Sequence, residues 1–265
     1  DTTPDPVAIR VRRLDDDALW ITPAFQVPES PVYPFTSSAV VREAIAGRGM
    51  YVVEPAGWRA VEDPGVRPAL FEHLVDVERQ HVRATLGLLA LVADWRLLAH
   101  VVTLPDRVSH AFWRFHEPGA YPPLPPAELA ASRSVVADAY RESDRLLGEL
   151  LARLGPDTNL LVVSDHGTAA GPPPYGTHRP EGILVAAGPD IEAGRERIAM
   201  SILDVAPVAL ALLGMPAAED LPGEVPPGLL AAGAGAGTVY SYEAGGTQQP
   251  AGAETIDETT REQLR

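Results

Sequence analysis

Apolar residues recur at intervals of three and four positions over two long stretches of the chain, with polar residues between them. The first stretch runs from Arg67 to Trp95, and the second runs from Leu129 to Leu154, where Gly155 and Pro156 end the pattern. This spacing places the apolar side chains on one face of an α-helix. We therefore predict two long amphipathic helices.

Three short and nearly continuous apolar runs lie between and after these helices. They are RLLAHVVTLP (residues 96–105), NLLVVSDHG (159–167) and GILVAAGP (182–189). Runs of this length, bounded by turn residues, are typical of strands buried on both faces of a parallel sheet. Because such strands alternate with helices here, the pattern predicts an α/β fold with a mainly parallel central sheet and helices on both of its faces.

The chain before the first long helix has a mixed pattern. Residues 7–33 alternate short apolar stretches with prolines, which is typical of strands near the edge of a sheet. Thr36 offers an N-cap hydroxyl to a helix that would follow it, and YVVEP (51–55) predicts a further short strand.

The carboxyl-terminal part holds one more helix signal and then loses its pattern. Ser201 and Asp204 have the spacing of a capping box at the start of SILDVAPVALALLG. Beyond Leu230 the sequence AAGAGAG and a polar acidic end predict a flexible, low-complexity tail. We therefore expect an α/β domain over residues 1–230 and a tail over 231–265.

Composition narrows the range of partners. Hydrophobic residues make up 46% and charged residues 22%, as in ordinary globular domains. The balance of 21 basic against 36 acidic side chains gives a formal charge of −15, which disfavours a nucleic acid polymer as a partner. A small phosphate-ester substrate stays open, because bound metal ions reverse the sign of the local field.

The absence of cysteine restricts the chemistry further. Without thiolates, a transition metal in this chain must bind to nitrogen and oxygen ligands. No apolar run reaches 18 residues, and the segment DTTPDPVAIRVRR has no hydrophobic core of a signal peptide. The sequence predicts no membrane segment in this chain and leaves its compartment open.

Five potential metal ligands occur at three places: Asp106 with His110, Asp165 with His166, and His178. The first pair is four residues apart, on one face of a helix, and the others flank predicted strands, where ligands of open α/β folds collect. Each place alone is equally well explained by a cap, a turn or a surface histidine. Two carboxylates and three imidazoles together form a zinc-type ligand set, which manganese and iron also use.

The segments that carry these residues resemble a known family. LPDRVSHAFWRF, LLVVSDHG and GTHRPEGILVAAGP are similar to the metal-site blocks in the second half of type I phosphodiesterase/nucleotide pyrophosphatase proteins of the alkaline phosphatase superfamily. The resemblance extends from about residue 10 to residue 215. It implies an alkaline-phosphatase-like α/β fold and a metal-dependent phosphoric ester hydrolase, either a phosphodiesterase or a phosphatase.

The resemblance also implies roles for the ligands. Asp106, His110 and His178 would hold one divalent ion, and Asp165 and His166 would help to hold a second. Such a two-metal site, with zinc as the favoured metal, stabilises the attacking and leaving oxygens of an in-line phosphoryl transfer. Non-catalytic metal or ligand binding, and phosphomutase or sulfatase activity as found elsewhere in the superfamily, remain alternatives.

The sequence departs from the family in one respect. In the family that it resembles, an upstream half provides another aspartate ligand and a threonine or serine nucleophile, and the resemblance implies that the given sequence begins after that half. Thr36 is better explained as an N-cap. We therefore identify no nucleophile, expect weak or absent activity of this segment alone, and expect self-association through an exposed sheet edge.

Other polar residues lie close to the candidate ligands or within the predicted elements. Arg107 and Arg179 flank ligands, and the sequence leaves two roles open for them: binding of phosphate oxygens, or pairing with nearby carboxylates such as Glu181. His100 falls in a predicted buried strand and is expected to be structural, whereas His73 is expected to be solvated.

Overall fold

The computed structural model describes residues 61–194, 198–235 and 237–242, together with four short strands nearer the amino terminus. These strands form two antiparallel pairs. They are β1 (Val7–Ala8) with β4 (Phe25–Gln26), and β2 (Val11–Arg13) with β3 (Leu19–Ile21). The helix predicted after Thr36, the strand predicted at 51–55 and the chain beyond 242 lie outside the described residues.

The chain divides into two compact units, which are described separately. The first comprises Asp1–Leu154 and Thr168–His178, and the second comprises Gly155–Gly167 and Arg179–Arg265.

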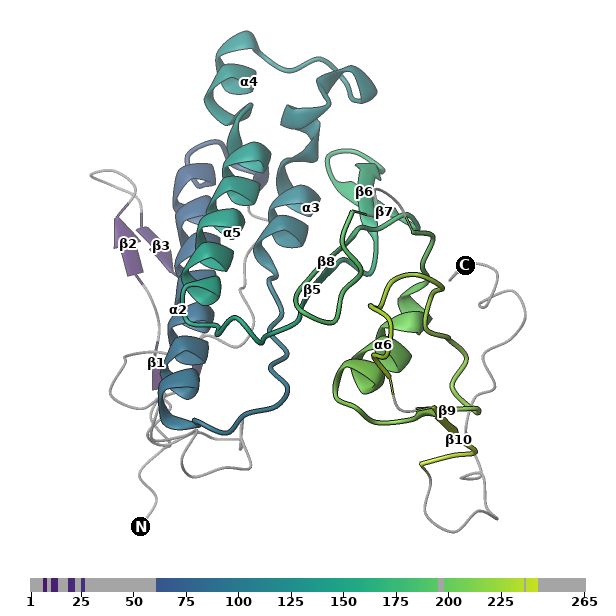
Figure 1. Ribbon diagram of the computed structural model, residues 1–265. Coiled ribbons are helices and arrows are strands. Elements are labelled where there is room, and N and C mark those ends of the chain that lie inside the picture. The colour runs from purple at the N-terminus through teal and green to yellow at the C-terminus, as the bar shows by residue number, and fades with distance from the viewer. Residues whose placement is uncertain are drawn as a thin grey trace, which may run out of the picture. The chain divides into compact units, whose positions relative to one another are not determined.

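Helices dominate the first unit (Figure 1). They are α2 (Arg67–Leu91), α3 (Leu104–His116), the 3-10 helix η2 (Pro118–Ala120), α4 (Pro126–Ser132) and α5 (Val135–Leu151). The first predicted long helix is confirmed as α2. The second is present as two helices, because the backbone turns at Arg133 and Ser134 between α4 and α5.

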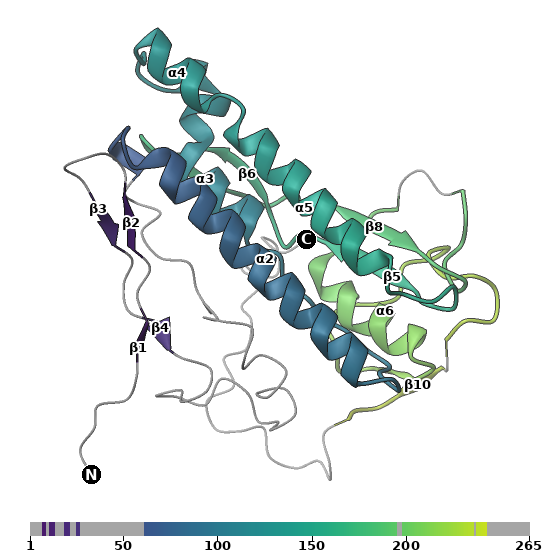
Figure 2. The same ribbon diagram turned by 90° about the vertical axis from the view of Figure 1, so that its left-hand side faces the viewer.

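Helices α2, α3 and α5 pack side by side, as both views show (Figure 2). Phe112 and Phe115 of α3 are fully buried between them, next to Leu70 of α2 and Val136 of α5. Burial of one such side chain stabilises the fold by about 1.5–3 kcal/mol. This apolar contact fixes α3 against its two neighbours.

The prediction of a strand at residues 96–105 is wrong. Residues 96–103 have no regular secondary structure, and Leu97 and Val101 are 63% and 74% exposed. A strand forms only where a neighbour accepts and donates its backbone hydrogen bonds. The described part of the chain offers this segment no such neighbour, and helix α3 begins at Leu104 instead.

A small hairpin completes the first unit. Strands β6 (Gly167–Ala170) and β7 (Gly176–Arg179) pair with each other. The hydroxyl of Tyr121 donates to the carbonyl oxygen of Tyr175 (2.9 Å) and accepts from the amide of Gly171 (3.2 Å). Tyr121 thereby ties the loop of the hairpin to the segment that follows α3.

The second unit contains the other two predicted strands in a different pairing. They are β5 (Leu160–Val163) and β8 (Leu184–Ala187), and they pair antiparallel with each other. The described residues therefore combine helices with small two-stranded sheets, and the predicted mainly parallel central sheet is not confirmed among them. These two apolar runs form strands as predicted, but an apolar run does not encode strand direction, which depends on the partner.

The rest of the second unit follows the predicted capping box. Ser201 and Asp204 form that box at the 3-10 helix η3 (Ile202–Asp204), which leads into α6 (Val205–Leu212). Beyond it, β9 (Ala217–Ala218) and β10 (Thr238–Val239) pair in parallel. The region predicted as a tail thus includes strand β10.

An ion-pair cluster joins α2 to α5 in the first unit. The Glu142 carboxylate accepts hydrogen bonds from Arg145 of its own helix (2.6 Å) and from Arg79 of α2 (2.7 Å). The Arg145 hydrogen bond, with help from Arg79, lowers the pKa of Glu142 from 4.5 to about 2. Because the pKa is lower in the folded state, the ionised carboxylate stabilises the fold.

We predict that Glu142→Gln lowers the free energy of unfolding near neutral pH by about 1 kcal/mol, since the neutral amide loses the charge-assisted bonds. The contribution of Glu142 is complete above pH 4.5 and is lost as the pH falls through about 2. The gap in melting temperature between variant and wild type should therefore narrow on acidification. Asp144→Asn, an exposed position on the same helix, is the control; a gap independent of pH would contradict the assignment.

Candidate metal centre

Helix α3 places two of the predicted ligands on one face. Asp106 lies in its first turn and His110 lies one turn later. The Nε2 atom of His110 is 3.4 Å from Oδ1 of Asp106. A carboxylate in the first turn is also favoured by the partial positive charge of the helix N-terminus.

Strand β7 brings the third ligand to the same face, because its first residue is a glycine. A Cβ atom on Gly176 would lie 2.6 Å from the carbonyl oxygen of Ser109 and 3.0 Å from Cβ of Trp113, both on α3. Only glycine permits this approach of strand to helix. His178 follows two residues later, on the same side of the strand.

The Gly176 carbonyl also sets the tautomer of His110. A carbonyl oxygen only accepts, so Nδ1 of His110 donates to it, at 3.1 Å. In a neutral imidazole the lone pair is then on Nε2, the atom that faces Asp106 and His178. Metal-binding histidines characteristically use their second nitrogen in this way.

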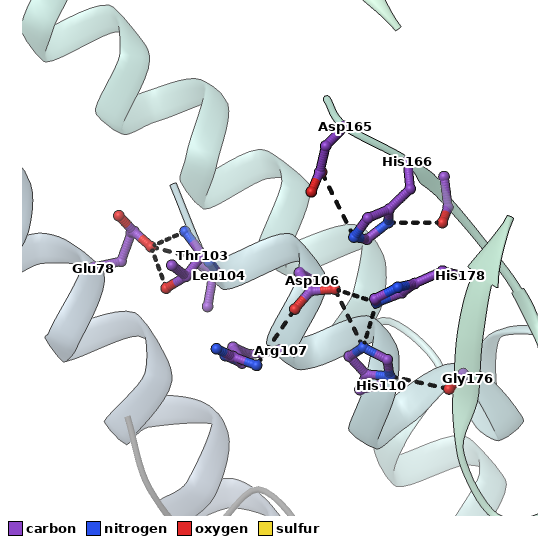
Figure 3. A network of polar contacts seen from close by, with 11 residues as sticks. Glu78, Thr103, Leu104, Asp106, Arg107, His110, Asp165, His166, Gly176 and His178 are labelled. Atoms are coloured by element: carbon purple, nitrogen blue, oxygen red, sulfur yellow. Dashed lines mark hydrogen bonds and ion pairs between the residues drawn. The ribbon is translucent and has the colours of Figure 1, made fainter. Parts of the chain in front are cut away.

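Three donor atoms therefore converge in the first unit (Figure 3). Nε2 of His110 and Nε2 of His178 are 2.8 Å apart, and each lies 3.4 Å from Oδ1 of Asp106. Bond lengths of about 2.0–2.1 Å in a tetrahedral zinc site imply donor separations of about 3.4 Å. Two of the three separations fit that value, and the third would widen by about half an ångström. The residues present thus fit a divalent ion.

The second predicted pair lies at the end of strand β5, in the second unit. Asp165 is mostly exposed, and its Oδ1 atom is 3.6 Å from Nε2 of His166. Nδ1 of His166 donates to the carbonyl oxygen of Gly167 at 3.0 Å. The lone pair of His166 is therefore on Nε2, on the side of the Asp165 carboxylate.

The two arginines are engaged with carboxylates. Nη1 of Arg107 is 3.7 Å from Oδ2 of Asp106. Nε of Arg179 donates to Glu181 at 2.9 Å, and this hydrogen bond lowers the pKa of Glu181 below its ordinary value. The pairing of Arg179 with Glu181, one of the two roles weighed from the sequence, is the one that the structure has.

Glu78 is a residue that the sequence analysis missed. It lies in α2, is fully buried, and accepts hydrogen bonds from the amides of Thr103 (2.8 Å) and Leu104 (3.0 Å) at the start of α3. A signal was available, because Glu78 follows Leu74 by four residues and so shares the apolar face of its helix.

Two histidines of this region also differ from their predicted settings. His73 was expected to be solvated and is fully buried, because it follows Leu70 by three residues on the apolar face of α2. His100 lies outside any strand, and its Nδ1 is 2.9 Å from the hydroxyl oxygen of Thr85. Burial lowers the pKa of His100 more than the nearby Glu78 raises it.

Comparison with known proteins gives one match. The family model described as Type I phosphodiesterase / nucleotide pyrophosphatase matches residues 12–219. No curated protein and no solved structure matches the chain. Among the described residues, none of the helices has both the length and the apolar character needed to cross a membrane.

We predict that Gly176→Ala lowers the free energy of unfolding by about 1–3 kcal/mol, because the added methyl group overlaps the Ser109 carbonyl and pushes β7 away from α3. Urea unfolding measures the change. The matched control is Gly148→Ala in α5, where the same methyl group meets no atom within 4 Å and should stabilise the helix by about 0.5–1 kcal/mol. Equal stability of Gly176→Ala and the wild type would contradict the close contact.

Proposed function

The chain belongs to the Type I phosphodiesterase / nucleotide pyrophosphatase family, and from this premise we propose that it is a metal-dependent phosphoric ester hydrolase that uses Asp106, His110 and His178 as metal ligands. The family itself points to hydrolysis of phosphoester bonds. The observation that carries the proposal is the convergence of an aspartate and two histidines, with His110 and His178 separated by 68 residues in sequence and 2.8 Å in space. Imidazole nitrogens and a carboxylate oxygen brought together from distant parts of the chain are the kind of ligand set that zinc uses in proteins.

The donor set favours zinc. Imidazole nitrogen and carboxylate oxygen are both common zinc ligands, and no thiolate is available. Manganese and iron accept the same donors and remain alternatives. A divalent cation, when bound, supplies a Lewis acid for a phosphoryl oxygen and lowers the pKa of a coordinated hydroxyl group.

The protein's own contribution is to hold the donors in a fixed orientation. The Gly176 carbonyl keeps the ring of His110 turned so that Nε2 points to the centre. The first turn of α3 holds Asp106 one turn before His110. We also propose that Arg107 binds an oxygen of the phosphate ester, for which a guanidinium group is well suited. Arg179 is assigned the same role, in competition with Glu181.

A second ion is the finer part of the proposal. In agreement with the family's metal-site blocks, Asp165 and His166 are assigned as ligands of this ion. Supporting this role, the bond from His166 to the Gly167 carbonyl leaves the Nε2 lone pair as the coordinating one. The proposed reaction is an in-line phosphoryl transfer from a small phosphate ester. No nucleophile is assigned to a residue of this chain.

We predict that His110→Ala and His178→Ala each weaken zinc binding by more than roughly 100-fold, because even the loss of a residue that only orients a ligand costs 10–100-fold. Elemental analysis after purification without chelator, followed by zinc titration, measures the effect. His116→Ala is the control, since His116 is exposed on the same helix as His110. Unchanged metal content in the His110 and His178 variants would remove the metal-ligand assignment.

Activity is tested on the natural gene product with nitrophenyl phosphate monoesters and diesters. We expect hydrolysis that a chelator abolishes and added zinc restores. A protein that binds metal but cleaves neither ester would instead be a non-catalytic metal-binding domain. Preference for a sulfate ester, or transfer of a phosphoryl group within one molecule, would identify a sulfatase or a phosphomutase.

A further inference from the structure

The buried carboxylate of Glu78 ties helix α2 to the start of helix α3. Its Oε2 atom accepts three hydrogen bonds: from the Thr103 amide (2.8 Å), the Leu104 amide (3.0 Å) and the Thr103 hydroxyl (3.2 Å). Figure 3 shows this group next to the turn that carries Asp106. A fully buried carboxylate is costly unless such bonds compensate for its lost hydration.

Helix α3 needs this acceptor, because it has no cap of its own. The side chain of its N-cap residue, Thr103, caps no backbone amide of the helix, and Pro105 contributes no amide hydrogen. The first amides of a helix have no partner within the helix. Glu78 satisfies two of them and places a negative charge at the positive end of the helix dipole.

The apolar core holds little of the segment that enters α3. Leu97 and Val101 are largely exposed, and the segment has no strand partner among the described residues. The other oxygen of Glu78, Oε1, lies 3.9 Å from Nε2 of His100 in the same segment. This separation is too long for a hydrogen bond, so the hydrogen bonds of Glu78 to the entering chain are those at Thr103 and Leu104, where the helix begins.

We propose that Glu78 is a positioning residue for the metal centre: by fixing the first turn of α3 against α2, it sets where Asp106 and His110 meet His178. The inference rests on the proposed metal site. Asp106 follows Leu104 by two residues, so a shift or rotation of the first turn moves its carboxylate directly. His110, one turn further along the same helix, moves with it.

The experiment compares Glu78→Gln with the wild type by calorimetric titration with Zn²⁺ alone. Glutamine has nearly the same shape but lacks the charge and one acceptor oxygen. The control is Glu72→Gln, the same chemical change at an exposed position of α2. We expect the zinc Kd of Glu78→Gln to rise roughly 10–100-fold, the range found for residues that orient metal ligands, while that of Glu72→Gln stays at the wild-type value.

The readout separates positioning from mere stability. Circular dichroism fixes a temperature at which each variant is folded, and the Kd is measured there. A purely structural role would lower the melting temperature and leave the Kd of the folded protein unchanged, which would overturn the proposal. A wild type that binds no zinc would instead refute the metal site itself.

A second substitution at Glu78 tests the proposal if Glu78→Gln does not fold. Should Glu78→Gln unfold, Glu78→Asp is titrated in its place, because aspartate keeps the charge but ends one carbon short of the amides. A weakened affinity supports the proposal and an unchanged affinity overturns it. If neither variant folds, Glu78 is a requirement for folding as a whole, and the positioning role is likewise overturned.

Discussion

The contact between strand β7 and helix α3 is the constraint on which the candidate site depends. Gly176 lies so close to Ser109 and Trp113 that no larger residue fits, and its carbonyl accepts the Nδ1 proton of His110. A single backbone position thus determines how near His178 comes to α3 and which nitrogen of His110 faces it. Both conditions are needed before two imidazoles and a carboxylate can share one cation.

Helix α3 is in turn held by two different kinds of contact. Along most of its length, the buried rings of Phe112 and Phe115 pack against α2 and α5. At its first turn the contact is polar, through Glu78. Apolar packing is non-directional, whereas a hydrogen-bonded carboxylate fixes a particular pair of amides. The ligand-bearing end of the helix is therefore the end held by the more specific interaction.

The sequence pattern predicted those features of the fold that depend on residues close together in the chain. Helix α2, the common face of Asp106 and His110, the capping box at Ser201 and the existence of strands β5 and β8 all follow from short-range spacing and were confirmed. The division between α4 and α5 could not be predicted, because the break falls at Arg133 and Ser134 and neither residue is a proline or a glycine. Strand direction was not readable either, because an apolar run is compatible with a parallel or an antiparallel partner.

Non-local contacts explain the remaining differences. The run at 96–105 has the composition of a buried strand but lacks a partner in the described chain, so its valines are exposed. Glu78 and His73 have polar side chains on an apolar face, and sequence alone does not say which distant groups will meet them. Residue type alone indicates the three places in the sequence where metal ligands are expected. The contact between His110 and His178 is not indicated in this way, because it depends on Gly176, which is 66 residues from His110.

The central claim is that Asp106, His110 and His178 share one cation, and anomalous diffraction at the zinc edge from crystals grown with zinc tests it most directly. The account predicts an anomalous peak about 2.0–2.2 Å from Oδ1 of Asp106 and from Nε2 of both histidines. A protein whose anomalous peaks all lie away from these three atoms, with the imidazoles still in direct contact, would contradict it.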